Sequence, residues 1–261
     1  MPGFWSLVLN QRIDESHNSK KPMLRNLPAR ILFRTLMAAE RMNRRHSLLG
    51  DKPFFASGDL PWPRLLEART PEIRAELDAL LKDVQRLPSF QDISPEQATL
   101  TSDAGWKTFF FKGYGVDFPK NMQRCPRTAE ALALIPGMKT AFFSILAPGK
   151  VIPEHRGPYN GVLRYHLGLR VPASDETCAI RVNGILRNWS EGESLVFDDT
   201  FMHEAWNRTP HWRIVLFVDF LRPLPLVPRL VNKLMMEVMQ RTAFVKVAVK
   251  NQARWEDGFY S

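Results

Sequence analysis

The 261-residue sequence is poor in cysteine and has no long hydrophobic run. Its two cysteines, Cys125 and Cys178, lie far apart and form no CxxC pair, which excludes a disulfide framework and a cysteine-based zinc motif. We expect both to be inert thiols in a reducing compartment. No apolar stretch approaches the roughly 20 residues that cross a bilayer, and residues 1–11 lack the basic segment and cleavage site of a signal peptide. These absences predict a cytoplasmic protein without a transmembrane helix.

Acidic residues are also scarce, but only at the two ends of the chain. Lys and Arg outnumber Asp and Glu by nine to three in residues 1–50 and by seven to three in 221–261, whereas 51–220 has twenty against twenty-one. This asymmetry predicts an anionic surface as partner, either a membrane or a nucleic acid. We divide the chain into a basic N-terminal extension (1–50), a central domain (51–220) and a basic C-terminal helix (221–261).

Helical periodicity occurs outside the central stretch. Residues 1–27 carry little pattern and are expected to be partly disordered, whereas 28–46 form a basic amphipathic helix with apolar Leu32, Phe33, Leu36 and Met37 opposite Arg30, Arg34, Arg41 and Arg45. Such a helix either packs on the central domain or lies on a membrane surface. Further helices are expected at 70–87, with Thr70 as N-cap, at 125–134, and from Val227, where Leu230, Val231, Leu234, Met235, Val238 and Val245 oppose Arg229, Lys233 and Arg241.

Strand patterns dominate residues 142–220. Alternation over 162–169 places Arg164 and His166 on one face, and in 212–220 Arg213 stands at the start of an otherwise apolar strand. Residues 106–114 and 138–146 also favour strands, and Asn183-Gly184 between apolar flanks predicts a tight hairpin. Short strands with such turns are typical of a β-sandwich or barrel. At strand ends, His155 and His203 can converge in its mouth.

Two converging histidines suggest a non-haem iron site, which commonly adds a carboxylate two residues after the first histidine. Here that position is Gly157. Three alternatives follow: the site holds no iron, water fills the third place, or a carboxylate comes from elsewhere in the chain. Glu154 adjoins His155 and should point to the opposite face, whereas Asp198 and Asp199 are better placed to cap backbone amides.

Four motifs resemble the aspartyl/asparaginyl β-hydroxylase family, which also contains bacterial lipid A acyl-chain 2-hydroxylases: HRGP at 155–158, LRYHLGL at 163–169, FDDTFMHE at 197–204 and RIVL at 213–216. The resemblance implies a mainly β fold with flanking helices, built on a double-stranded β-helix (jelly-roll or cupin-like) core that binds Fe(II) and 2-oxoglutarate. It implies iron ligation by His155 and His203 without a carboxylate. It also places the distal carboxylate of 2-oxoglutarate on Arg213 and Ser144, and the iron-chelating end on Arg164 and His166.

The implied activity is hydroxylation of an unactivated carbon with molecular oxygen. With basic helices at both ends, the leading prediction for the substrate is the acyl chain of a membrane lipid such as lipid A, reached by peripheral contact with an anionic membrane at its inner face. The alternatives are a peptidyl aspartyl/asparaginyl or small-molecule hydroxylase and, from a different class, a non-catalytic basic barrel that binds nucleic acid or membrane. The absence of any nucleic-acid motif disfavours nucleic acid as a partner.

Overall fold

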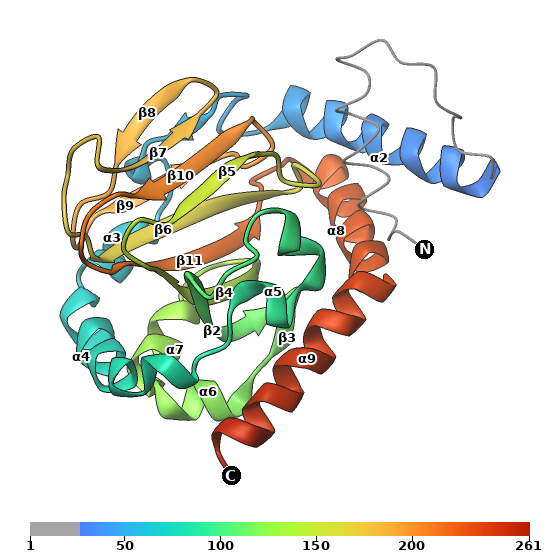
Figure 1. Ribbon diagram of the computed structural model, residues 1–261. Coiled ribbons are helices and arrows are strands. Elements are labelled where there is room, and N and C mark those ends of the chain that lie inside the picture. The colour runs from blue at the N-terminus through green and yellow to red at the C-terminus, as the bar shows by residue number, and fades with distance from the viewer. Residues whose placement is uncertain (1–26) are drawn as a thin grey trace.

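Two antiparallel sheets face each other and form the body of the protein (Figure 1). The computed structural model describes residues 27–261, with side chains from residue 31 onward except that of Leu32. The larger sheet has the order β1 (Phe54–Phe55), β9 (Ser194–Phe197), β6 (Val162–Arg170), β11 (Arg213–Leu221), β4 (Met138–Leu146), β2 (Trp106–Gly113) and β3 (Val116–Asp117). The smaller has the order β5 (Val151–His155), β10 (His203–Asn207), β7 (Cys178–Val182) and β8 (Ile185–Asn188).

This arrangement confirms the mainly β fold with flanking helices and a double-stranded β-helix core. The expected strand at 138–146 coincides with β4, and those at 106–114 and 162–169 differ from β2 and β6 by one residue at one end. The strand expected at 212–220 is shifted by one residue at both ends relative to β11. The predicted hairpin joins β7 to β8. Asn183 and Gly184 both have positive φ, 50° and 75°, as a two-residue type I′ turn requires.

Helices cover the outer face of the larger sheet and its ends (Figure 1). The α-helices are α2 (Leu27–His46), α3 (Pro63–Glu67), α4 (Thr70–Leu80), α5 (Phe90–Ile93), α6 (Pro119–Arg124), α7 (Pro126–Leu132), α8 (Leu226–Gln240) and α9 (Ala243–Phe259). Three 3-10 helices are η1 (Ser57–Asp59), η2 (Leu81–Arg86) and η3 (Pro95–Thr99).

Two helix predictions need correction. The helix expected at 70–87 ends at Leu80 and continues as the 3-10 helix η2, where Asp83 has non-helical φ/ψ; its N-cap is Arg69, so Thr70 already lies inside the helix. The single C-terminal helix is two helices, because Thr242 is extended (φ −67°, ψ 154°) and begins α9 in a new direction. The division at residues 50 and 220 stays a prediction.

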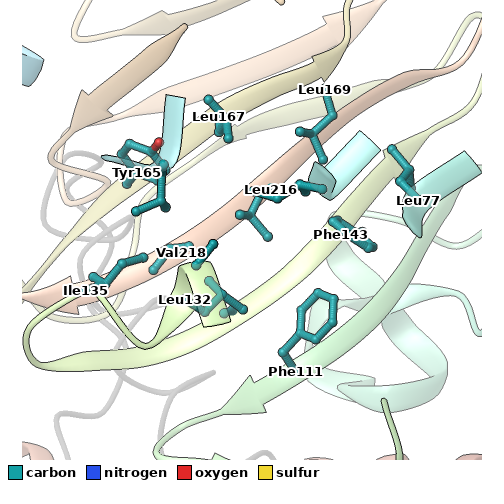
Figure 2. Close-up of a cluster of buried hydrophobic side chains, with 14 of the residues drawn as sticks. Leu77, Phe111, Leu132, Ile135, Phe143, Tyr165, Leu167, Leu169, Leu216 and Val218 are labelled. Carbon is teal, nitrogen blue, oxygen red and sulfur yellow. The ribbon is translucent and has the colours of Figure 1, made fainter. Parts of the chain in front are cut away.

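The outer face of the larger sheet carries the main hydrophobic core (Figure 2). Tyr165, Leu167 and Leu169 of β6 and Leu216 and Val218 of β11 pack there, and helix residues such as Leu77 and Leu132 cover them. The period-two alternation of a strand therefore turns Arg164 and His166 to the inner face, into the barrel. A second core, made of apolar side chains from both sheets, lies between the sheets on this inner face.

At one end of the barrel, α2 packs against α8. Leu36 is buried there with Tyr159 and Met236, while Arg34, Arg41 and Arg45 are exposed, which confirms the two faces predicted for this helix where side chains are described. The expectations for residues 1–26 and for the side chains of Arg30 and Leu32 lie outside the described residues. In the described part of the chain, every helix is too short or too polar to span a bilayer.

Candidate active site

The two histidines singled out in the sequence lie side by side. His155 ends β5 and His203 begins β10, and the two residues are direct partners in the antiparallel register. Their ring centroids are 4.1 Å apart, which is close contact for residues 48 positions apart in the chain. The smaller sheet thus holds both imidazoles from neighbouring strands.

Hydrogen bonds fix the tautomer of both rings. Nδ1 of His155 lies 2.8 Å from the carbonyl oxygen of Pro153, and Nδ1 of His203 lies 3.0 Å from that of Phe201. A carbonyl only accepts, so each Nδ1 carries the proton and each Nε2 offers its lone pair. Burial lowers the pKa of His155 to about 4 and that of His203 well below its usual value. Both rings are therefore neutral, which a metal ligand requires.

Among the described residues, Arg213 is a buried cation without a counter-ion. Its side chain is almost fully buried, and Nε and Nη1 have no hydrogen-bond partner in the part of the chain that the structure describes. The guanidinium stacks on Trp189, 4.4 Å from the ring centroid. Burial lowers the pKa of Arg213 to about 10, so it remains charged at neutral pH. Within the described residues no carboxylate forms an ion pair with it, and because an unpaired buried charge is costly, this geometry suits an anionic ligand.

Ser144 and His166 add hydrogen-bond donors beside Arg213. Ser144 faces Val215 in the register of β4 and β11, one diagonal step from Arg213. Its hydroxyl oxygen accepts a hydrogen bond of 3.0 Å from the indole of Trp106, which leaves its proton for another acceptor. Nδ1 of His166 accepts from the indole N–H of Trp189 at 3.2 Å.

The bond from Trp189 decides where His166 keeps its proton. An indole N–H only donates, so Nδ1 of His166 is the acceptor and Nε2 carries the hydrogen. That Nε2 is buried and has no hydrogen-bond partner among residues 27–261 as the structure describes them. Burial, followed by the charge of Arg213, holds the pKa of His166 well below its usual value, so the ring is neutral. The barrel interior therefore presents a guanidinium and an imidazole N–H that both lack acceptors.

Arg164 shares the inner face with His166 as expected, but its guanidinium is already engaged. Nε donates to Asp219 at 2.9 Å, and Nη2 lies 2.8 Å from Oδ2 of Asp199. The group also lies over the ring of Phe217, 4.2 Å from its centroid. Its expected contact with 2-oxoglutarate stays a prediction. Any anion that it binds shares it with two carboxylates.

Asp199 fills the space beside Gly157. A Cβ built on Gly157 would meet the Oδ2 atom of Asp199 at 2.2 Å, and Gly157 donates its N–H to the Asp199 carbonyl at 2.7 Å. The carboxylate from the start of the β9–β10 turn thus takes the room that a side chain two residues after His155 would need. Burial raises the pKa of Asp199, and the nearby Arg164 opposes that rise.

The expectation that both aspartates cap backbone amides holds for one of them. Asp198 accepts from the N–H of Thr200 at 2.9 Å, whereas the side chain of Asp199 pairs with Arg164 instead. Glu154 is exposed, as expected for a neighbour of His155 on the opposite face of the strand. No group of three or more His, Cys, Asp or Glu side chains among the described residues is arranged to hold a metal ion.

Sequence reasoning missed Trp189 altogether. It follows the last residue of β8 and stands between Asn188 and Ser190, a polar setting without periodicity that gives no signal of burial. The structure buries it and makes it a contact of both Arg213 and His166. The other predicted site residues, Ser144 among them, do face the same barrel interior.

Comparison with known proteins gives one consistent family. The sequence profile described as Aspartyl/Asparaginyl beta-hydroxylase matches residues 67–223. The chain is 45% identical over 241 residues to an ornithine lipid ester-linked acyl 2-hydroxylase of Rhizobium tropici, covering 92% of this chain and 86% of that protein. It is 34% identical to aspartate beta-hydroxylase domain-containing protein 2 of Xenopus tropicalis, over 70% of this chain and about half (53%) of the frog protein.

Among solved structures, a Pseudomonas putida prolyl-4-hydroxylase aligns with a TM-score of 0.40 and 16% identity. The alignment covers 72% of this chain and 98% of that chain.

Proposed function

The chain belongs to the aspartyl/asparaginyl β-hydroxylase family, and from this premise we propose that it is an Fe(II)- and 2-oxoglutarate-dependent hydroxylase of a lipid acyl chain. The observation that carries the cofactor assignment is the buried, uncompensated Arg213 in the same barrel as two neutral histidines. An oxo-dicarboxylate supplies the negative charge that Arg213 lacks, and a metal takes the free lone pairs of the histidines.

His155 and His203 would hold the iron through Nε2. Imidazole nitrogen suits iron, and the bond from each Nδ1–H to a backbone carbonyl is the usual means of orienting a histidine ligand. Bound Fe(II) and 2-oxoglutarate supply the oxidation of a C–H bond to an alcohol by oxygen, with 2-oxoglutarate converted to succinate and carbon dioxide. The protein's part would be to hold these groups and to position the substrate.

Two ends of the 2-oxoglutarate have separate partners in this proposal. Arg213 and Ser144 hold the distal carboxylate, because a buried guanidinium can form charge-assisted, two-point contacts with it. His166 donates its Nε2–H to the end nearer the histidines, beside Arg164. A tryptophan holds each of these groups in place. Trp189 contacts both Arg213 and His166, and Trp106 contacts Ser144.

The proposed substrate is the acyl chain of a membrane lipid. The relative from Rhizobium tropici is named for hydroxylation at carbon 2 of the ester-linked acyl chain of ornithine lipid, and it aligns with this chain over nearly its whole length. An ornithine lipid is therefore favoured over the lipid A-like substrate expected from the sequence. The relative from Xenopus tropicalis is named only for an aspartate β-hydroxylase domain. A peptide substrate therefore stays the alternative.

Mass spectrometry of lipids incubated with the enzyme, Fe(II), 2-oxoglutarate and oxygen tests this proposal. We expect one lipid class to gain one oxygen atom on an acyl chain, with one succinate formed for each oxygen gained. Omission of 2-oxoglutarate should prevent the gain. Hydroxylation of Asp or Asn in a peptide library, with no change in any lipid, would contradict the lipid assignment and favour the alternative.

Trp189→Phe should weaken 2-oxoglutarate binding while leaving the fold intact. Phenylalanine keeps an aromatic ring under Arg213 but removes the indole N–H that sets the tautomer of His166. The loss of this hydrogen bond is expected to raise the KM for 2-oxoglutarate about fivefold to tenfold. The matched control is Trp206→Phe, because the Trp206 indole donates to the carbonyl of Glu176. Equal KM values in the two variants would contradict the role of Trp189.

Gly157→Ala should damage the site through Asp199. The added Cβ would meet that carboxylate well inside contact distance, so Asp199 must move away from Arg164. A displacement of about 1 Å near reacting groups costs about 100-fold in turnover. Gly58→Ala is the control, because a Cβ there meets no atom within 4 Å. The clash should also lower the melting temperature, and the Gly157→Ala/Asp199→Gly protein, which lacks the clashing carboxylate, should recover that loss. Full activity in Gly157→Ala alone would contradict this account.

A further inference from the structure

Helix α8 turns a row of large apolar side chains toward solvent. Leu226, Leu230 and Leu234, spaced by four, are 60%, 55% and 56% exposed, and Val238 continues the row. The side that α8 buries consists of Pro228, Asn232 and Met236. The apolar face predicted from the sequence is therefore mostly the exposed one. Amphipathic helices on globular proteins usually bury their apolar stripe. We therefore expect a binding partner to cover this exposed row.

Basic side chains border the apolar row. Arg229 and Lys233 of α8 and its C-cap Arg241 are exposed and lie three residues after Leu226, Leu230 and Val238. They therefore lie beside the apolar row and not opposite it, where the sequence pattern predicts them. Glu237 is the one acidic residue of α8. The adjoining helix α2 exposes Arg34, Arg41 and Arg45 as well. An apolar stripe flanked by cations is complementary to an anionic lipid surface, where the apolar side chains enter the acyl region and the cations meet the headgroups.

The same helix pair is attached to the loop that leads from the histidine site. Asn232 of α8 donates to the carbonyl of Gly161 at 2.8 Å, and Glu40 of α2 lies 3.3 Å from Arg156, the residue next to His155. Both helices stand at this end of the barrel (Figure 1). Met202, next to His203, is a further exposed apolar side chain. A partner that bound the exposed face of α8 would therefore lie close to the site formed by His155 and His203.

We propose that the outer face of α8, formed by Leu226, Leu230, Leu234 and Val238 with Arg229, Lys233 and Arg241, docks on a bilayer surface that contains anionic lipid. The docking itself follows from the exposed residues, and only its purpose rests on the proposed function. That purpose is to bring the acyl chain of a bilayer lipid to the mouth of the barrel without extracting the whole lipid into water.

Sedimentation with phosphatidylcholine vesicles, with and without phosphatidylglycerol, tests the apolar half of the docking face. The Leu226→Gln/Leu230→Gln/Leu234→Gln protein should bind mixed vesicles at least about tenfold more weakly than the unmodified protein, because three apolar side chains no longer enter the bilayer. The matched control changes three exposed apolar residues elsewhere, as Leu65→Gln/Val116→Gln/Leu134→Gln. This control should bind as the unmodified protein does.

A second variant tests the basic residues of the docking face. Arg229→Gln/Lys233→Gln should lose roughly tenfold or more on the mixed vesicles and little on pure phosphatidylcholine, and salt should weaken binding of the unmodified protein in the same way. Arg64→Gln/Lys82→Gln removes two exposed cations elsewhere and should leave binding unchanged.

Vesicle binding that stays unchanged in both α8 variants would overturn the proposal. So would a dimer of the unmodified protein that the leucine variant dissociates, because the face would then belong to a second copy of the chain. Hydroxylation of detergent-dispersed lipid is measured in parallel. Normal hydroxylation with unchanged vesicle binding rejects the docking face alone, whereas weakened vesicle binding with no hydroxylation in any protein supports the docking face and rejects the function.

Discussion

Replacement of either His155 or His203 by alanine is expected to abolish iron binding and turnover. The two imidazoles are direct cross-strand partners with their Nε2 lone pairs free, and each variant would leave a single protein ligand. Loss of a residue that merely orients a metal ligand already costs about 10-fold to 100-fold in affinity, so loss of a ligand itself should exceed that range. Metal content after anaerobic loading and the rate of succinate formation measure the effect.

The control for this experiment is another histidine. His211→Ala changes an exposed residue in the β10–β11 turn and should leave iron content and turnover unchanged. Circular dichroism and thermal melting establish that the two ligand variants are folded. Full turnover in the folded His155→Ala or His203→Ala protein would refute the ligand assignment.

Arg213→Met should raise the KM for 2-oxoglutarate steeply without harming the apoprotein. Hydrogen bonds to a charged group contribute about 1.5–3 kcal/mol each, so loss of two such bonds corresponds to about 100-fold or more in binding. The apoprotein itself loses a buried charge that has no counter-ion among the described residues, and its melting temperature should stay the same or rise. Initial rates over a range of 2-oxoglutarate concentrations test the expected rise in KM, and a melting curve without ligand tests the expected melting temperature.

Arg222 provides the matched contrast. It is as deeply buried as Arg213, but its guanidinium is ion-paired with the buried Asp198. Arg222→Met leaves that carboxylate uncompensated and should destabilise the fold by about 3–5 kcal/mol. If Arg213→Met lowered the melting temperature as much as Arg222→Met, Arg213 would be a structural residue and the anion pocket would lose its main support.

The features that short-range rules govern could be predicted from the sequence. Period-two alternation placed Arg164 and His166 on one face of β6, and the Asn183-Gly184 pair located the hairpin, because both depend only on local backbone geometry. The two histidines were expected to converge because both stand at strand ends in a barrel pattern, and the structure pairs them across β5 and β10.

The features that depend on tertiary packing could not be predicted. Asp199 looked like a turn residue, and only the close approach of the Gly157 backbone shows that its carboxylate occupies the space that a side chain at position 157 would need. Trp189 has no sequence signal that distinguishes it from a surface residue. The periodicity of α8 revealed an apolar face but not that this face is turned outward, because Asn232 and Met236 on the other side make its contacts with the barrel end.

The most direct test of the central claim is an anaerobic titration of the apoprotein with Fe(II) and 2-oxoglutarate, followed in the visible spectrum. A chelated oxo-acid on iron gives a charge-transfer band, and we expect this band to appear at one equivalent of iron and to be absent from the His203→Ala protein. No band from the folded, unmodified protein, with both components in excess, would contradict the assignment of this barrel as an iron and 2-oxoglutarate site.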